Sequence, residues 1–263
     1  MHWKSLTAAI ERSSTPRGRE VSGLFAVEGF RLIERALAAG LAIESAVFGA
    51  SLTSREDERA RRLLERLEAA GVELVEAPDE ALLKATGGRE TGALAALIRL
   101  PGPRELREVL PAAGPCRVLV AVGVDDPGNL GALARTALAG GADAFVITGV
   151  GDPYHPRAVR ISRGSLFRIP VIRFDAPEQL LEALEASEVE TLAAVTTGGR
   201  PLDEVVPPAD ARWAICMGSE AFGLPETLVP SMDHAVSIPM AEGVDSYSVH
   251  AAAAILLYAL RAR

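Results

Sequence analysis

The chain has 263 residues, enough for two domains, and its 49% of hydrophobic and 24% of charged residues are typical of a globular protein. A formal net charge of −8 excludes a surface that is basic throughout, so contact with nucleic acid would need local basic patches. The longest apolar run, VHAAAAILLYAL, is too short to span a membrane, and no membrane partner is expected.

The first part of the chain alternates between two hydrophobic periodicities. Short apolar runs predict strands at residues 24–29, 44–49, 71–77 and 92–100. Helical spacing of apolar residues predicts helices at 30–40, 54–71 and 79–88. This alternation indicates a small α/β domain over residues 1–99, which begins with a polar, basic extension.

A linker and a second α/β series follow. Residues 100–115 are rich in proline and glycine around one short helical pattern, and we interpret them as a linker. Residues 116–263 are expected to form a second domain with a parallel sheet, because several of its strands are apolar on both faces. The predicted strands are 116–123, 144–148, 169–174, 189–195, 212–218 and 234–240, and the last predicted helix is 246–263.

The first helix of this second domain carries a solitary arginine. Asn129 is placed to cap that helix, and apolar residues follow it at helical spacing. Arg135 lies on the opposite face among small residues, and the helix holds no acid to pair with it. Its guanidinium either reaches solvent or a sheet carbonyl, or is held for an anionic ligand. The helix alone does not separate these interpretations.

Further arginines gather where acids are absent. The stretch 153–173 contains no acid and five arginines, Arg157, Arg160, Arg163, Arg168 and Arg173, and the N-terminal extension adds Arg17 and Arg19. Such residues are either a solvated surface or contacts for phosphate groups.

The cysteines and histidines carry little chemistry. Cys116 and Cys216 lie far apart in apolar runs, so we expect buried thiols in a reducing cytoplasm. The polar start of the chain lacks the apolar core of a secretory signal, which also favours the cytoplasm. The histidines lack the spacing of metal ligands, and no metal site is expected.

Three polar, glycine-containing turns each follow a predicted strand of the second domain. They are DDPGNLGALARTA, MGSEAFGLPE at residues 217–226, and IPMAEGVDSYSVHAAAAILL at residues 238–257. Ligands of open α/β sheets bind outside the carboxyl ends of the strands, so these turns would meet at one crevice. Taken singly, Gly218 to Glu220 could be a plain capped turn, and Ser246 could simply cap the last helix.

Together, in this order, the three turns resemble the three motifs of the SpoU/TrmH family of RNA ribose 2′-O-methyltransferases, of the SPOUT class. The stretch YHPRAVRISRGSLFRIPV also fits that family. FAVEGFRLIERAL resembles the start of the family's substrate-binding domain, which is itself similar to a ribosomal RNA-binding protein. The resemblance covers nearly the whole chain.

The resemblance implies a specific architecture and activity. It implies that the parallel-sheet domain ends in a deep trefoil knot that binds S-adenosylmethionine, and that the chain forms a homodimer through this domain. The methyl group would pass to a ribose hydroxyl of RNA. The N-terminal domain favours ribosomal RNA over tRNA, and the RNA phosphates would be contacted by Arg17, Arg19, Arg157, Arg160, Arg163 and Arg168.

By position in the motifs, the catalytic group is Asn129, Arg135, Glu220 and Ser246. The resemblance places the cofactor against Thr196, Gly218, Ile238, Met240, Tyr247 and Ser248. It makes Arg135 the base that takes the hydroxyl proton. A guanidinium that grips the adjacent phosphate and stabilises the alkoxide is the alternative, since arginine side chains hold their protons firmly.

The third motif departs from the family. Its usual Ser-Leu-Asn-Val reads Ser-Tyr-Ser-Val here, so Ser248 stands in place of the asparagine. A hydroxyl has a shorter reach than an amide. This difference keeps open a non-catalytic RNA-binding module that retains the fold. A methyltransferase for a small molecule or a protein would fit the acidic composition but leaves the N-terminal domain without a role.

Overall fold

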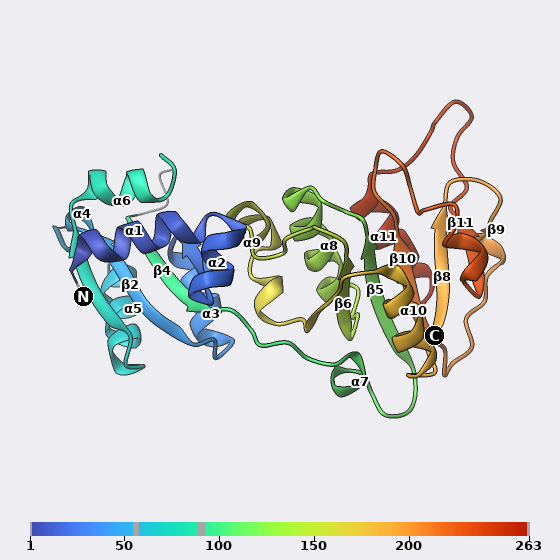
Figure 1. The fold of residues 1–263 in the computed structure, drawn as a ribbon, viewed down its shortest axis with the longest axis horizontal. Coiled ribbons are helices and arrows are strands. Elements are labelled where there is room, and N and C mark those ends of the chain that lie inside the picture. The colour runs from blue at the N-terminus through green and yellow to red at the C-terminus, as the bar shows by residue number, and fades with distance from the viewer. Residues whose placement is uncertain (1, 55–57, 89–92, 262–263) are drawn as a thin grey trace. The chain divides into compact units, whose positions relative to one another are not determined.

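The structure is a computed structural model that describes residues 2–54, 58–88 and 93–261 (Figure 1). The parts of the predicted elements at 55–57, 89–92 and 262–263 lie outside the described residues. The chain forms two compact units: Met1–Gly102 with Tyr154–Phe167, and Pro103–Pro153 with Arg168–Arg263. No described helix has both the length and the apolarity needed to cross a membrane.

The first unit is built on a four-stranded sheet of order β1-β4-β2-β3. Only β2 and β3 run parallel; β4 pairs antiparallel with β1 and with β2. The strands are β1 Leu24–Glu28, β2 Ile43–Gly49, β3 Glu73–Ala77 and β4 Leu94–Arg99. The helices before and between them are α1 Trp3–Ser13, α2 Pro16–Ser22, α3 Phe30–Ala38, α4 Ala50–Ser54, α5 Glu58–Ala69 and α6 Asp79–Ala85.

The polar N-terminal extension forms two helices, α1 and α2. Leu6 and Ile10 lie one helical turn apart on α1 and are buried in the core of the first unit, beside Ala26 of β1 and Val47 of β2. Their i, i+4 spacing was the signal for this helix, and the surrounding charges obscured it.

Arg19 does not lie on the surface. It is 3% exposed on α2, and its Nη1 donates a hydrogen bond of 2.6 Å to the Ser13 carbonyl. Burial lowers the pKa of the guanidinium. The prediction that Arg19 contacts RNA is therefore wrong, because this side chain joins α2 to the end of α1.

Residues 154–167 pack with the first unit, although the sequence analysis assigns them to the domain 116–263. They form α9, Pro156–Ser162, and a short 3₁₀ turn, Ser165–Phe167. The ring of Phe25 in β1 lies 5.0 Å from that of Tyr154 and 6.2 Å from that of Phe167, between centroids. Arg35 of α3 also donates to the carbonyl of Arg163. Aromatic packing thus attaches this stretch to the N-terminal sheet.

The second unit is built on a seven-stranded sheet of order β7-β6-β5-β10-β8-β11-β9, in which every pair is parallel, as predicted. The strands are β5 Cys116–Val122, β6 Ala144–Thr148, β7 Val171–Phe174, β8 Glu190–Val195, β9 Arg200–Pro201, β10 Arg212–Met217 and β11 His234–Ser237. The helices are α7 Leu106–Val109, α8 Pro127–Ala139, α10 Pro177–Glu185 and α11 Val249–Ala259, with 3₁₀ turns at Leu202–Glu204 and Val229–Ser231.

The sheet sets the position of the site. Its middle strands are apolar on both faces, and Val118, Val120 and Cys216 are fully or almost fully buried in the core. Leu106 and Leu110, within the predicted linker, belong to the same core. Because β8, β10 and β11 are parallel neighbours, the turns that follow them all leave from the same edge.

Candidate active site

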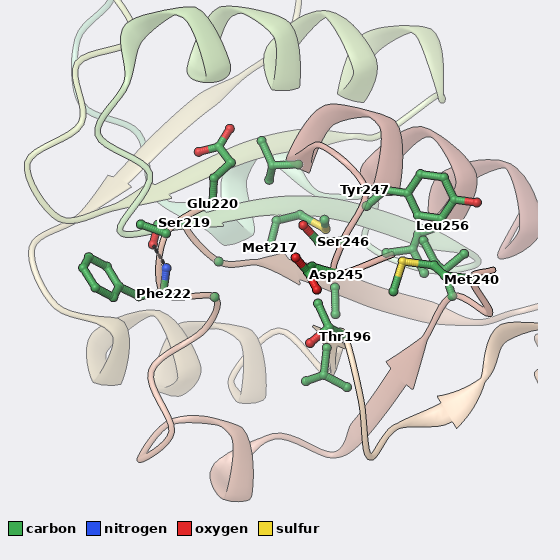
Figure 2. Close-up of a pocket in the computed structure, with 18 of the residues that line it drawn as sticks. Thr196, Met217, Ser219, Glu220, Phe222, Met240, Asp245, Ser246, Tyr247 and Leu256 are labelled. Carbon is green, nitrogen blue, oxygen red and sulfur yellow. Dashed lines mark hydrogen bonds between the residues drawn. The ribbon is translucent and has the colours of Figure 1, made fainter. Parts of the chain in front are cut away.

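A cavity of about 330 Å³ opens at this edge, within the size range of ligand sites (Figure 2). Its walls come from the ends of β8, β10 and β11, from the turn after β10, from the segment before α11, and from α11 itself. The lining residues are Ala194–Thr196, Met217–Gly223, Val236, Ile238, Met240, Asp245–Tyr247, Val249, Ala252 and Leu256.

Most of the predicted cofactor residues lie in this cavity. Thr196, Gly218, Ile238, Met240 and Tyr247 all line it. They come from three separate turns of the sequence, which the parallel sheet brings together. Two of the three motifs therefore meet here.

Ser248 does not line the cavity and is instead the N-cap residue of α11. Its carbonyl accepts a hydrogen bond of 3.0 Å from the Ala252 backbone N–H. Ser246 lines the cavity and does not cap the helix, which begins only at Val249. The simple capping interpretation of Ser246 is therefore wrong, whereas a contact of Ser248 with the cofactor stays a prediction.

The cavity has an apolar side and a polar centre. In Figure 2, Tyr247, Met240 and Leu256 gather on one side. The oxygen-bearing side chains of Thr196, Asp245 and Ser246 lie near one another at the centre. Asp245 is not among the predicted site residues, although Asp245 stands directly before Ser246 in the third motif. Such a cavity can hold a flat apolar group beside a group that carries positive charge or hydrogen-bond donors.

Gly218 is required by close packing. A Cβ atom there would lie 2.0 Å from the carbonyl carbon of Gly223 and 2.1 Å from the amide nitrogen of Leu224. The turn 219–223 that follows presents Glu220, which is exposed. Its carboxylate points away from the three oxygen-bearing side chains at the centre (Figure 2).

Helix α8 carries the two predicted catalytic residues that do not line the cavity. Asp126, not Asn129, is its N-cap, because the Asp126 carboxylate accepts a hydrogen bond of 2.9 Å from the Asn129 backbone N–H. Asn129 therefore lies inside the first turn. The signal was Pro127, a residue common at the first helical position.

Arg135 is exposed on α8, and within the described parts of the chain its side chain has no hydrogen-bond or ion-pair partner. This leaves the guanidinium available to an external anion. Helix α8 packs against α11, where the side chain of Leu257 leaves no room for a Cβ at Gly140. The helix of Arg135 is thereby fixed to the helix that closes the cavity.

The remaining predicted RNA contacts are all exposed. They are Arg17, Arg157, Arg160 and Arg163 in the first unit and Arg168 in the second. Arg173, from the same acid-free stretch, instead donates to the carbonyls of Gly149, at 2.6 Å, and Gly151, at 3.1 Å. It serves the fold.

Both thiols are buried and free. Burial raises the pKa of Cys216 to about 12. Burial, and secondarily the nearby Asp143 carboxylate, raises the pKa of Cys116 to about 11. A thiol with a raised pKa is a poor nucleophile, which leaves neither cysteine a role in the site.

Comparison with known protein families gives two matches. The SpoU rRNA Methylase family matches residues 117–258, and an MRM3-like substrate binding domain matches residues 9–96. Among curated proteins, the 23S rRNA (guanosine(2553)-2'-O)-methyltransferase RlmP of Bacillus subtilis is 32% identical over 261 residues, covering 98% of this chain and 94% of that protein.

Solved structures agree with this match. The SpoU methyltransferase AviRb from Streptomyces viridochromogenes, in complex with AdoMet, has a TM-score of 0.86 and 25% identity, covering 97% of this chain and 96% of that one. A structure described as an RNA 2'-O ribose methyltransferase has a TM-score of 0.79 and 30% identity, covering 97% and 94%.

Proposed function

The chain belongs to the SpoU rRNA methylase family, and we infer that it transfers the methyl group of S-adenosylmethionine to a ribose 2′-hydroxyl of ribosomal RNA. One observation carries this conclusion for the chain's own residues. The second and third motifs, which are far apart in the sequence, build the walls of one cavity. The relatives are named as methyltransferases of 23S rRNA or of tRNA and rRNA, so a small-molecule or protein substrate has no support.

The cavity suits the cofactor. Ile238, Met240 and Leu256 offer apolar surface to a purine ring. Thr196 and Ser246 offer hydroxyls, and the Asp245 carboxylate would attract the cofactor's positive charge. When bound, S-adenosylmethionine supplies a methyl group on a sulfonium sulfur that leaves as a neutral thioether.

Arg135 would bind the RNA at the acceptor ribose. Its exposed guanidinium, without a partner among the described residues, can grip a phosphate bidentately and stabilise the negative charge that develops on the 2′-oxygen. We prefer this role to that of a base, because a guanidinium keeps its proton at ordinary pH. Asn129, Glu220 and Ser246 complete the polar group around the acceptor ribose.

The same domain would form a homodimer that completes the site. The side of α11 opposite its buried stripe carries His250, Ala254 and Tyr258, spaced one helical turn apart and all exposed. Tyr258 is 68% exposed and takes the guanidinium of Arg261 over its ring, 3.6 Å from the centroid. An apolar and aromatic helix face of this kind favours a second copy as its partner.

We further propose that the C-terminal end is threaded through a deep trefoil knot. In the sheet β8 lies between β10 and β11, yet α11, which follows β11, packs back on β10 and α8. General fold rules alone would exclude such threading.

The first unit, which contains residues 1–99, would select the RNA, and the second unit, which holds the cavity, would carry out the methyl transfer. Its match to a substrate binding domain supports this division. Arg17, Arg157, Arg160, Arg163 and Arg168 would contact phosphates, because they are exposed. With rRNA as substrate and two buried thiols, we place the enzyme in the cytoplasm.

The direct test is methyl transfer from labelled S-adenosylmethionine to unmodified large-subunit rRNA made by transcription. We expect label at a position that resists alkaline cleavage, because a 2′-O-methyl group blocks attack on the neighbouring phosphodiester. Arg135→Ala should abolish transfer while S-adenosylmethionine still binds, as measured by calorimetry. Arg135→Lys should restore little activity, since an ammonium cannot grip a phosphate bidentately.

Two results would contradict this proposal. Near-normal transfer by Arg135→Lys would exclude the bidentate grip. Cofactor binding by the wild type without transfer to any rRNA would favour a non-catalytic RNA-binding module, and would point to Ser248 in the third motif as the reason.

A further inference from the structure

Phe222 is the most exposed large hydrophobic residue in the described parts of the chain, with 91% of its surface open to solvent. It lies in the turn after β10, two residues after Glu220, and is one of the residues that line the cavity. Its ring nevertheless points away from Thr196, Met217 and Asp245 (Figure 2). Phe222 therefore stands at the edge of the cavity with its ring directed outward.

The turn that carries Phe222 is tightly bonded. The Ser219 N–H donates to the Gly223 carbonyl at 3.1 Å, and the Gly223 N–H donates back to the Ser219 carbonyl at 2.8 Å. The backbone N–H of Phe222 donates to Ser219 Oγ at 3.3 Å. Gly218 and the buried Leu224 hold the two ends of the turn. The ring thus projects from a fixed backbone, which lowers the entropic cost of binding through it.

A single exposed phenylalanine is not unusual by itself, but its position beside a substrate cavity is informative. Among the described residues, no aromatic ring stacks on Phe222. An aromatic face that is rigidly held and open to solvent is the surface on which unstacked RNA bases bind, because every base has a flat apolar face of its own.

We propose that Phe222 stacks on a nucleobase of the RNA, at or next to the nucleotide whose ribose is methylated. This inference rests on the proposed function of the cavity. The acceptor ribose must reach the mouth of the cavity, and the base attached to it, or to its neighbour, is then the nearest flat apolar group to the ring. Phe222 is a positioning residue, since it orients the nucleotide and moves neither proton nor methyl group.

A protein partner is the less favoured occupant. A second copy of the chain packed over the ring would have to leave the mouth of the cavity, lined by Phe222 itself, open to the acceptor ribose. A nucleobase meets that condition because it enters together with the ribose.

The test compares aromatic and aliphatic side chains at this position in the full chain, with unmodified large-subunit rRNA transcript as substrate. Loss of base stacking in Phe222→Ala and Phe222→Leu should raise the KM for RNA about tenfold. Phe222→Tyr and Phe222→Trp should stay within about twofold of the wild type, because they keep a stacking face. Binding of S-adenosylmethionine and the melting temperature should be unchanged in all four variants.

Val206→Ala is the matched control, because Val206 is 84% exposed in the same unit and does not line the cavity. It should leave the KM for RNA unchanged. An unaltered KM in Phe222→Ala, or full activity in Phe222→Leu, overturns stacking while the proposed function stands. If light scattering shows that Phe222→Ala is a monomer where the wild type is a dimer, base stacking is overturned in favour of a protein contact. Absence of transfer by the wild type overturns both proposals together.

Discussion

Gly218 links the end of β10 to the turn at the cavity, and its lack of a side chain is a requirement of that position. The atoms that a Cβ would meet, at 2.0 and 2.1 Å, belong to the backbone of Gly223 and Leu224 and cannot rotate away. Glycine here therefore serves close packing rather than an unusual backbone angle.

We expect Gly218→Ala to lower the free energy of unfolding by on the order of 2 kcal/mol, because overpacking forces the turn to shift. The binding of S-adenosylmethionine should weaken as well, since the shifted turn lines the cavity. Urea denaturation and calorimetry measure the two effects. Gly102→Ala is the control, because a Cβ at Gly102 meets open space. Equal stability of Gly218→Ala and wild type would contradict the packing argument.

The buried thiols give the stability a pH dependence at the alkaline end. Their ordinary pKa is 9.0, and burial raises it to about 12 in Cys216 and about 11 in Cys116. Their contribution is present in full below pH 9 and is lost as the pH rises through these higher values. Above pH 9 the unfolded chain loses the thiol protons first, so stability should fall by about 1.4 kcal/mol per pH unit for each thiol.

Urea denaturation between pH 8 and pH 11 under reducing conditions measures this dependence. A variant with both cysteines replaced by alanine should show a shallower decline, whatever its stability at pH 8. Parallel declines in the two proteins would count against buried thiols as the cause.

At the scale of the element, α8 depends on the cap that the structure assigns to Asp126. Asp126→Ala should destabilise the protein by about 1 kcal/mol, because the Asn129 backbone N–H loses its acceptor. Methyl transfer should also fall, since Asn129 and Arg135 lie on this helix. Asp125→Ala is a matched control, because Asp125 is exposed and stands outside the cap. Similar losses in both variants would show that the cap is not the cause.

The elements that the sequence predicts well are those whose own residues carry a strong pattern. The runs around Val118 and Ile215 are apolar on both faces and predict buried parallel strands. Strand β9, Arg200–Pro201, is too short for any pattern, and the apolar pair of α1 is diluted by charges. The cap of α8 was misplaced by three residues because Asp and Asn are equally good caps, and only Pro127 distinguishes them.

The candidate site was predictable only in part. The motif residues locate Gly218, Met240 and Tyr247 in the cavity, because the carboxyl ends of parallel strands must meet at one edge. Neither the hydrophobic periodicity nor the residue spacing of the sequence indicates that Ser248 lies outside the cavity lining or that the Phe222 ring is exposed at the edge of the cavity. Those facts depend on where α11 begins and on the hydrogen bonds of the 219–223 turn.

At the scale of the whole molecule, the boundary between the units is not a single point in the sequence. Phe167 belongs to the first unit, although it follows β5 and β6 of the second unit in the sequence. We expect Phe167→Ala to destabilise the first unit by about 3 kcal/mol, because Phe25 loses an aromatic neighbour.

Hydrogen exchange of the full chain measures this effect, with faster exchange expected in β1 and β4. Phe145→Ala is the counterpart, because Phe145 is fully buried in β6 of the second unit. It should speed exchange in β5 and β6 instead. Faster exchange confined to the second unit in Phe167→Ala would contradict the assignment of residues 154–167 to the first.

The packing of residues 154–167 with the first unit also has a consequence for biosynthesis. A chain that emerges from the ribosome in order presents the whole N-terminal sheet long before Tyr154 and Phe167 appear. During that interval Phe25 lacks the rings that cover it. The first unit therefore cannot complete its folding until about a third of the second has been translated, and the two units mature as a coupled pair rather than in succession.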